Sequence, residues 1–287
     1  MKMDTAKIAT AITGDKLYQT RAREVLPILV RQAEAGTPIF YSALAAEVGI
    51  PNPRNLNYVL GSIGTTLENL SKAWKIKVPP IQCLVVNKST GLPGEGIGWF
   101  LVKKEDFSSL NKSQQRAIVE AELQYVFSFP RWREVLSVLS LKPVDANFSS
   151  QIKVAAKFGG GGESEDHKLL KAFVSKNPVV VGLPSNTPKG TTEFPLSSGD
   201  AVDVHFQLKS DWIAVEVKSA ISNEADITRG LFQCVKYKAV MEAMQLASGL
   251  PQNARSILAI ESEFPTSLVA LKNVLGIEVV DMVYKNG

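Results

Sequence analysis

The chain has 287 residues, of which 45% are hydrophobic and 21% are charged, the balance of an ordinary globular protein with room for two domains. No apolar run reaches the roughly 18 residues that a membrane span needs. The start, MKMDTAKIATAITGDK, carries acids instead of the apolar core of a secretory signal, so we expect a cytoplasmic protein without a membrane partner. Cys83 and Cys234 are widely separated and the chain has only two histidines, which argues against a zinc site or a disulfide framework.

The net charge of +4 is unevenly distributed. Residues 1–150 hold 18 basic and 13 acidic residues, a net of +5, whereas residues 151–287 hold 14 and 15, a net of −1. A basic front half beside a near-neutral back half is typical of a module that binds a polyanion joined to a second domain.

The front half, 1–150, is predicted to be mainly helical. Residues 23–36 form an amphipathic pattern closed by a glycine, residues 41–49 a short helix, and residues 52–74 one helix or two with a break near Gly61 or Gly64. Two strands are predicted at 81–87 and 98–102, and two more helices within 114–141. Helix, short helix, helix and a two-stranded ribbon is the order of a winged helix-turn-helix.

The stretch IFYSALAAEVGIPNPRNLNYVLGSI also resembles the winged-helix DNA-binding part of alkylguanine alkyltransferases. Those enzymes have a reactive cysteine followed by histidine and arginine, whereas Cys83 is followed by Leu84 and Val85. We therefore expect the binding module without the activity. A winged helix that binds protein instead of DNA is the alternative.

In a DNA-binding module of this kind the second helix of the pair enters the major groove of duplex DNA. Side chains near the start of that helix would face the bases, and lysines beyond it would lie on phosphates. The first group comprises Arg54, Asn55, Asn57 and Tyr58, and the second Lys72, Lys75, Lys77 and Lys88.

A glycine-rich segment at 157–163 separates the two halves. Four consecutive glycines hold regular structure poorly, so we expect a linker that ends at a helix over 164–176, with Ser164 as its N-cap. The back domain, 160–287, is then predicted to continue with a strand at 178–183, a hairpin over 201–208 and 212–219, and a helix at about 226–247. A strand at 256–262, a helix at 265–275 and a strand at 277–284 complete it. This order predicts an α/β domain with a mixed sheet flanked by helices.

The predicted hairpin places charged residues on one face. With a two-residue turn at Lys209-Ser210, opposed residues have numbers that sum to 419, so Asp203 lies opposite Glu216. Cross-strand partners have Cβ atoms about 4.5–5.5 Å apart, and two carboxylates that close repel each other unless a proton or a cation intervenes. Oxygen ligands favour Mg²⁺ or Mn²⁺, and Lys218 adds a positive charge on the same face. His205 shares this face too, either as an outer contact of the site or as an ordinary polar strand residue.

These residues resemble the PD-(D/E)xK nuclease superfamily, whose restriction endonuclease-like fold serves many restriction enzymes, Holliday-junction resolvases and RecB-like nucleases. SGDAVDVHFQ followed by WIAVEVK carries the resemblance, which covers roughly 160–285. It implies that Asp203 and Glu216 bind metal and that Lys218 acts on the attacking water. Asp200 is displaced from a literal PD pair and would support the site.

The resemblance also implies an acid on the helix before the sheet. ESEDH offers Glu163, Glu165 and Asp166; we expect Glu165 to be the third metal ligand, with Glu163 second in order. RecB-like members carry a QxxxY pair on the helix after the lysine strand, which Gln233 and Tyr237 match. Arg229, a turn earlier on that helix, would reach a phosphate.

The sequence therefore predicts a Mg²⁺-dependent endonuclease that acts on DNA, of the kind found among restriction and anti-phage enzymes. Double-strand cutters of this fold often need two active sites, so monomer and homodimer both stay open. The alternatives are a DNA-binding regulator on an inactive nuclease fold, and a solvated strand face whose Glu216 and Lys218 form only a salt bridge.

Overall fold

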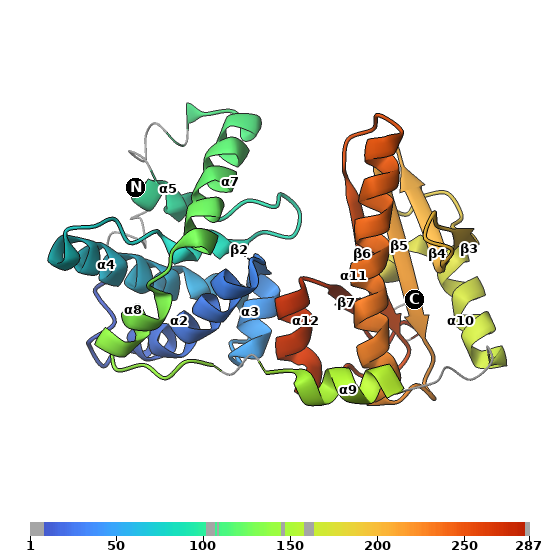
Figure 1. Ribbon diagram of the computed structural model, residues 1–287, viewed down its shortest axis with the longest axis horizontal. Coiled ribbons are helices and arrows are strands. Elements are labelled where there is room, and N and C mark those ends of the chain that lie inside the picture. Colours follow the sequence, from blue (N-terminus) through green and yellow to red (C-terminus); the bar gives the residue numbers. More distant parts are fainter. Residues whose placement is uncertain (1–8, 102–106, 108, 145–146, 158–163, 285–287) are drawn as a thin grey trace. The chain divides into compact units, whose positions relative to one another are not determined.

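The computed structural model describes residues 9–101, 107, 109–144, 147–157 and 164–284. The chain divides into two compact units, Met1–Ala146 and Asn147–Gly287 (Figure 1). No helix within the described ranges has the length and apolar character that crossing a membrane requires.

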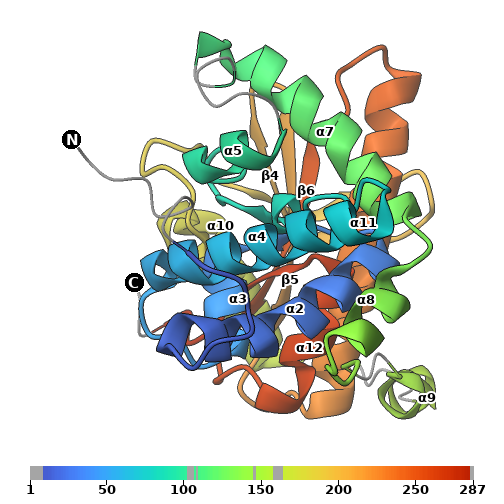
Figure 2. The ribbon, with the colours of Figure 1, turned by 90° about the vertical axis from the view of Figure 1, so that its left-hand side faces the viewer.

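The first unit is built mainly from helices. α4 packs along α2 (Figure 2), and their facing apolar residues, among them Leu26, Leu29, Ile63 and Leu67, form the centre of its core. Its helices are α2 (Leu17–Ala35), α3 (Tyr41–Glu47), α4 (Leu56–Trp74), α5 (Gly98–Leu101), α7 (Lys112–Ser128) and α8 (Trp132–Val138).

α4 is one uninterrupted helix, which decides between the two alternatives that the sequence left open. Gly64 does not break the helix; it lets the side chains of Phe100 and Gln82 pack close to the helix backbone. A Cβ atom at this position would lie 2.4 Å from the ring of Phe100 and 2.6 Å from the amide nitrogen of Gln82. Since real Cβ atoms do not come this close to their neighbours, only glycine fits here without a shift of the packing.

The predicted two-stranded ribbon at 81–87 and 98–102 is wrong. Residues Ile81–Leu84 form a 3₁₀ turn, and only β2 (Val85–Val86) is extended, pairing in parallel with β1 (Ile39–Phe40). Gly98–Leu101 is the short helix α5. The residues from Ile81 to Leu84 are all buried, and an apolar run without alternation does not distinguish a strand from a turn of helix.

The second unit is a mixed α/β fold with a five-stranded sheet flanked by helices, as the sequence predicts (Figure 1). Its strands are β3 (Thr191–Pro195), β4 (Ala201–Leu208), β5 (Asp211–Lys218), β6 (Ala254–Ile260) and β7 (Glu278–Val280). Its helices are α9 (Ser149–Lys157), α10 (Glu165–Lys176), α11 (Glu224–Ala247) and α12 (Val269–Leu275).

The sheet order is β3-β4-β5-β6-β7. The pairs β3-β4 and β4-β5 are antiparallel, and the pairs β5-β6 and β6-β7 are parallel. α10 packs on one face through Leu170 and Val174. α11 and α12 pack on the other face through Leu231 and Leu271. The sheet is thus the middle layer between helices (Figure 1).

The predicted strand at 178–183 is wrong. Pro178–Val181 form a 3₁₀ turn that ends at Gly182, whose φ of 74° lies in the left-handed region. Its apolar residues Val180 and Val181 are buried against α10, so the valine run serves the core without joining the sheet. The outer strand is β3, which the sequence did not predict because its residues are mostly exposed and show no apolar alternation.

The division between the units falls before α9. α9 belongs to the second unit and packs on α11. The linker predicted at 157–163 starts at the last residue of α9, and its remaining residues, 158–163, lie outside the described residues. The structure resumes at Ser164, whose side chain caps α10 by accepting a hydrogen bond from the N–H of His167, as predicted.

Candidate functional site

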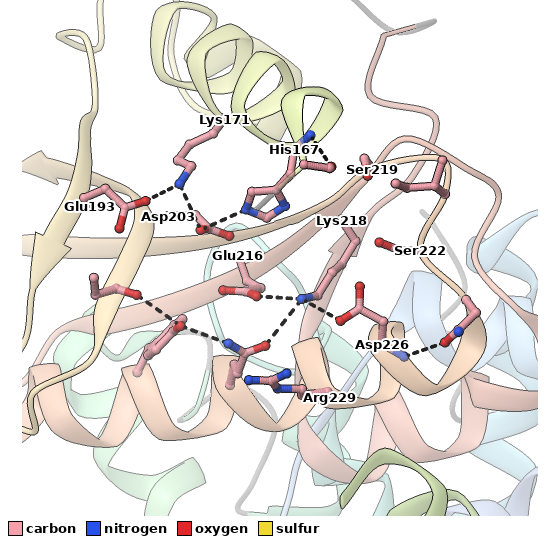
Figure 3. Close-up of a pocket in the computed structure, with 16 residues that line it drawn as sticks. His167, Lys171, Glu193, Asp203, Glu216, Lys218, Ser219, Ser222, Asp226 and Arg229 are labelled. Atoms are coloured by element: carbon pink, nitrogen blue, oxygen red, sulfur yellow. Dashed lines mark hydrogen bonds and ion pairs between the residues drawn. The ribbon is translucent and has the colours of Figure 1, made fainter. Parts of the chain in front are cut away.

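A pocket of about 570 Å³ opens beside the sheet of the second unit, within the size range of ligand pockets (Figure 3). Strands β3, β4 and β5 and helices α10 and α11 supply its walls, with the segment that joins β5 to α11. Five of the predicted site residues line it together: Asp203, Glu216, Lys218, Gln233 and Tyr237. Arg229 lines it as well.

The hairpin that carries the acids has the predicted register. Val204 pairs with Val215 and Phe206 with Ile213, so opposed numbers sum to 419 and the turn is Lys209-Ser210. Alternation then puts Val204, Phe206, Val215 and Val217 on the face that α10 covers. Lys218 is turned toward α11, whereas Asp203 lies where residues of α10 reach it as well. The chain folds this way because Val204, Phe206, Val215 and Val217 must all leave water on one side.

Asp203 is held from several directions. Its Oδ2 accepts a hydrogen bond from the backbone N–H of Val217 at 2.9 Å, and its Oδ1 lies 3.2 Å from Nε2 of His167. Burial opposes the charged form, but the hydrogen bonds from His167 and Val217 outweigh it and keep the pKa of Asp203 below its ordinary value. The carboxylate is therefore ionised at neutral pH.

Glu216, in contrast to Asp203, has a pKa above its ordinary value. Its side chain is only 4% exposed. Burial, and secondly the charge of Asp203, raise its pKa to about 7, although the ammonium of Lys218 opposes the rise. The ammonium of Lys218 thus offsets only part of the effect of burial and of the repulsion from Asp203, and a bound cation would offset the rest.

Lys218 is almost completely buried and joins three polar groups. Its Nζ lies 2.9 Å from Oε1 of Glu216 and 3.1 Å from Oδ1 of Asp226, and it donates to Oε1 of Gln233 at 3.5 Å. Burial lowers the pKa of this ammonium, but the charges of Glu216 and Asp226 overcome that effect and raise it. Lys218 therefore stays a cation in the pocket.

Gln233 and Tyr237 extend this network along α11. Gln233 donates through Nε2 to the hydroxyl of Tyr237 at 3.3 Å, and Tyr237 donates to the carbonyl of Ala201 at 3.2 Å. Both residues lie one turn apart on the face of α11 that covers the sheet. The pair thus connects the lysine on β5 to the start of β4.

The helix acid is not where the sequence placed it. Glu165 does not line the pocket: its side chain is 81% exposed and forms an ion pair with Lys168 at 2.7 Å. Asp166 is exposed as well, and Glu163 lies outside the described residues. Instead, α10 turns His167 and Lys171 toward the pocket. A helix rotates by about 100° per residue, so His167 points about 200° away from Glu165.

Four ionisable residues of the pocket were not predicted from the sequence: His167, Lys171, Glu193 and Asp226. Two of them, His167 and Lys171, are one turn apart on α10, a spacing that could have marked them once the buried face of that helix was known. Asp226 lies in the first turn of α11, where an acid is ordinarily explained by the helix dipole.

Asp200 and His205 do not belong to the pocket. Asp200 pairs with Lys236 at 2.7 Å near the surface. His205 is buried, with its ring stacked on Phe194 at 4.0 Å between centroids, and its Nε2 has no hydrogen-bond partner among the described residues. His205 is therefore a packing residue and neither a polar strand residue nor an outer contact of the acids.

The donor chemistry of Asp203 and Glu216 fits a hard divalent cation. Within the part of the chain that the structure describes, no group of three or more His, Cys, Asp or Glu side chains is arranged to hold a metal ion. Mg²⁺ is commonly held by one or two carboxylates, with water and substrate phosphate completing its shell. Two neighbouring carboxyl groups, one of which has its pKa raised by burial and by the charge of the other, meet that requirement.

In the first unit the residues predicted to contact DNA are exposed but do not form one cluster. Arg54, Asn55 and Asn57 lie at the start of α4, whereas Lys72 and Lys75 lie at its other end. At 1.5 Å per residue, Arg54 and Lys72 are about 27 Å apart along the helix. Lys88 lies on the loop after β2 and is also exposed, and Lys77 pairs with Glu122 at 2.7 Å.

Comparison of the chain with models of known protein families, with curated proteins and with solved structures found no match in any of the three.

Proposed function

We propose that the second unit is a metal-dependent nuclease of the PD-(D/E)xK type and that the first unit holds duplex DNA. The observation that carries the proposal is the convergence of five residues in one pocket: Asp203, Glu216, Lys218, Gln233 and Tyr237. They come from three separate elements, and each has the chemical character that hydrolysis of a phosphodiester requires.

Asp203 and Glu216 would hold Mg²⁺ or Mn²⁺, and the cation would supply charge stabilisation at the phosphoryl group and a bound water of lowered pKa. Lys218 presents a permanent ammonium beside these carboxylates, placed to orient the attacking water or to stabilise the scissile phosphate. Gln233 and Asp226 fix that ammonium from the other side.

Arg229 supplies a second cation on the same wall of α11, where a neighbouring phosphate of the strand would lie. The proposed substrate is DNA because the first unit is basic and exposes arginine, asparagine and lysine side chains along α4. A role in restriction or defence against phage rests on analogy with other nucleases of this build.

The test is the conversion of supercoiled plasmid by the purified full chain in Mg²⁺ and in EDTA. We expect cleavage only with the metal, and losses with Asp203→Asn, Glu216→Gln and Lys218→Met. Lys218→Met should lower the rate by about two to four orders of magnitude, the scale of a lost charge-stabilising or proton-transfer group. Lys236→Met is the matched control, since it removes an exposed, ion-paired lysine of α11 that does not line the pocket.

The competing function is a DNA-binding protein without nuclease activity, and one observation favours it. Lys218 already has two carboxylate partners in the pocket, as a purely structural ion-pair network would. Wild-type protein that binds plasmid but leaves it intact with both Mg²⁺ and Mn²⁺ would establish that alternative and overturn the proposal.

A further inference from the structure

Lys171 is a buried ammonium next to a proposed metal ligand. It reaches from α10 into the pocket, and its side chain is only 8% exposed. Its Nζ forms an ion pair with Oε1 of Glu193 and lies 3.7 Å from Oδ1 of Asp203 (Figure 3). A buried ammonium is costly unless it is paired, so these carboxylates are what keep Lys171 in place.

The two oxygens of Asp203 have different surroundings. Oδ2 is taken by the backbone N–H of Val217, whereas Oδ1 is shared by His167 and Lys171. A divalent cation that binds through Oδ1 meets the ammonium of Lys171 at close range. The cation and the ammonium would both lie next to Oδ1, and two positive charges that close in a buried site repel each other strongly.

Glu193 has an unusual backbone conformation for a strand residue. Its φ of 53° lies in the left-handed region, within β3. Thr192 pairs with Val204 and Phe194 pairs with Val202, so Glu193 occupies the step opposite Asp203. Left-handed backbone is unfavourable for a residue with a Cβ atom, and such strain gathers where a side chain is held for a function.

We infer that Lys171 and Glu193 are a pair of positioning residues that set the affinity of Asp203 for its cation. In the metal-free protein the ammonium neutralises Asp203, and when a cation binds there, Glu193 keeps the ammonium buried and paired. The inference rests on the proposed function, because it takes Asp203 as a metal ligand.

Removing Lys171 and removing Glu193 should change the affinity for the cation in opposite directions. Lys171→Met removes the competing charge and should tighten cation binding about tenfold or more. Glu193→Gln leaves the ammonium with Asp203 as its neighbouring carboxylate and should weaken binding about tenfold. If Glu193 acts through Lys171, Glu193→Gln should change the affinity less than about threefold once Lys171 is already methionine.

The experiment is a titration of the full chain with Mn²⁺ alone, without DNA, in which electron paramagnetic resonance measures the free ion. Wild type, both single variants and the double variant are compared, with circular dichroism melts to verify folding. Lys168→Met is the control, because it removes a lysine of the same helix that is exposed and paired with Glu165. It should change the affinity less than about twofold.

The double variant removes both charges together, so it keeps the test valid if Lys171→Met alone does not fold. It should then bind Mn²⁺ more tightly than Glu193→Gln, and equal affinity would overturn the inference. Equal weakening by Glu193→Gln with and without Lys171 would also overturn it, since Glu193 would then act on the cation directly.

Asp203→Asn separates this inference from the proposed function. If Asp203→Asn abolishes Mn²⁺ binding while the Lys171 and Glu193 variants match wild type, the pair has no such role and the proposed metal site stands. If Asp203→Asn leaves Mn²⁺ binding unchanged, the proposed metal site itself fails, and with it the inference.

Discussion

Replacing Lys218 by methionine should strongly destabilise the second unit when no divalent cation is bound. The ammonium lies 2.9 Å from Glu216 and 3.1 Å from Asp226, and Lys218 is 6% exposed. Its loss leaves Glu216 buried beside Asp203 without its cation. Breaking one partner of a buried ion pair costs about 3–5 kcal/mol, so we expect a loss of that size in the free energy of unfolding.

Lys236→Met is the matched comparison. It also breaks a lysine–aspartate pair, but the side chain of Lys236 is 53% exposed and its ion pair with Asp200 lies near the surface. Exposed pairs contribute at most about 1 kcal/mol. The two variants therefore differ in burial and hardly at all in the type of charge removed.

Hydrogen exchange of the β5 and β6 amides in EDTA measures the stability of the second unit separately from the first. Added Mg²⁺ should recover much of the stability lost by Lys218→Met, because the cation replaces the missing positive charge. Equal free energies of unfolding for Lys218→Met and Lys236→Met in EDTA would refute the reasoning. The buried Glu216 would then not depend on the ammonium of Lys218.

The remaining predictions concern the sheet, the first unit and its DNA. Burial lowers the pKa of His205 to about 4, so the contribution of neutral His205 to stability is full above pH 6.5 and falls by about 3 kcal/mol as the pH drops from 6.5 to 4. The raised pKa of Glu216 acts in the opposite direction over this range, so urea titrations in EDTA should show the His205 contribution as a difference in pH slope between wild type and His205→Phe, and equal slopes would contradict it. Gly64→Ala should cost about 1–3 kcal/mol because its Cβ would collide with Phe100, and an unchanged melting temperature would contradict that packing. Lys72→Ala and Lys75→Ala should each lower the slope of log binding constant against log salt for duplex DNA by about 1, and an unaltered slope would remove these lysines from the interface.

The hairpin was predictable because alternation and turn length act locally. Once Lys209-Ser210 is taken as the turn, the pairing of Val204 with Val215 follows, and Asp203 must lie beside Glu216. The spacing of Gln233 and Tyr237 likewise fixes them on one helix face. These relations need no knowledge of the rest of the chain.

Contacts between distant elements were not predictable in the same way. The sequence shows acids and a histidine at the start of α10, but which face meets the sheet depends on where that helix packs. The resemblance to the nuclease superfamily predicts Glu165 in the site, but the packing of α10 turns His167 and Lys171 toward the pocket. The edge strand β3, which carries Glu193, was not predicted for a related reason. Its residues are mostly exposed, so they show no apolar alternation.

The most direct test of the central claim is a titration of the full chain with Mn²⁺, followed by plasmid cleavage by the same samples. It compares wild type with Asp203→Asn, Glu216→Gln and Lys218→Met. We predict that both carboxylate variants lose cation affinity and cleavage together, while Lys218→Met keeps or slightly gains affinity and loses cleavage. Cleavage by Lys218→Met at the wild-type rate would contradict the account, because the buried lysine would then be only a structural ion pair.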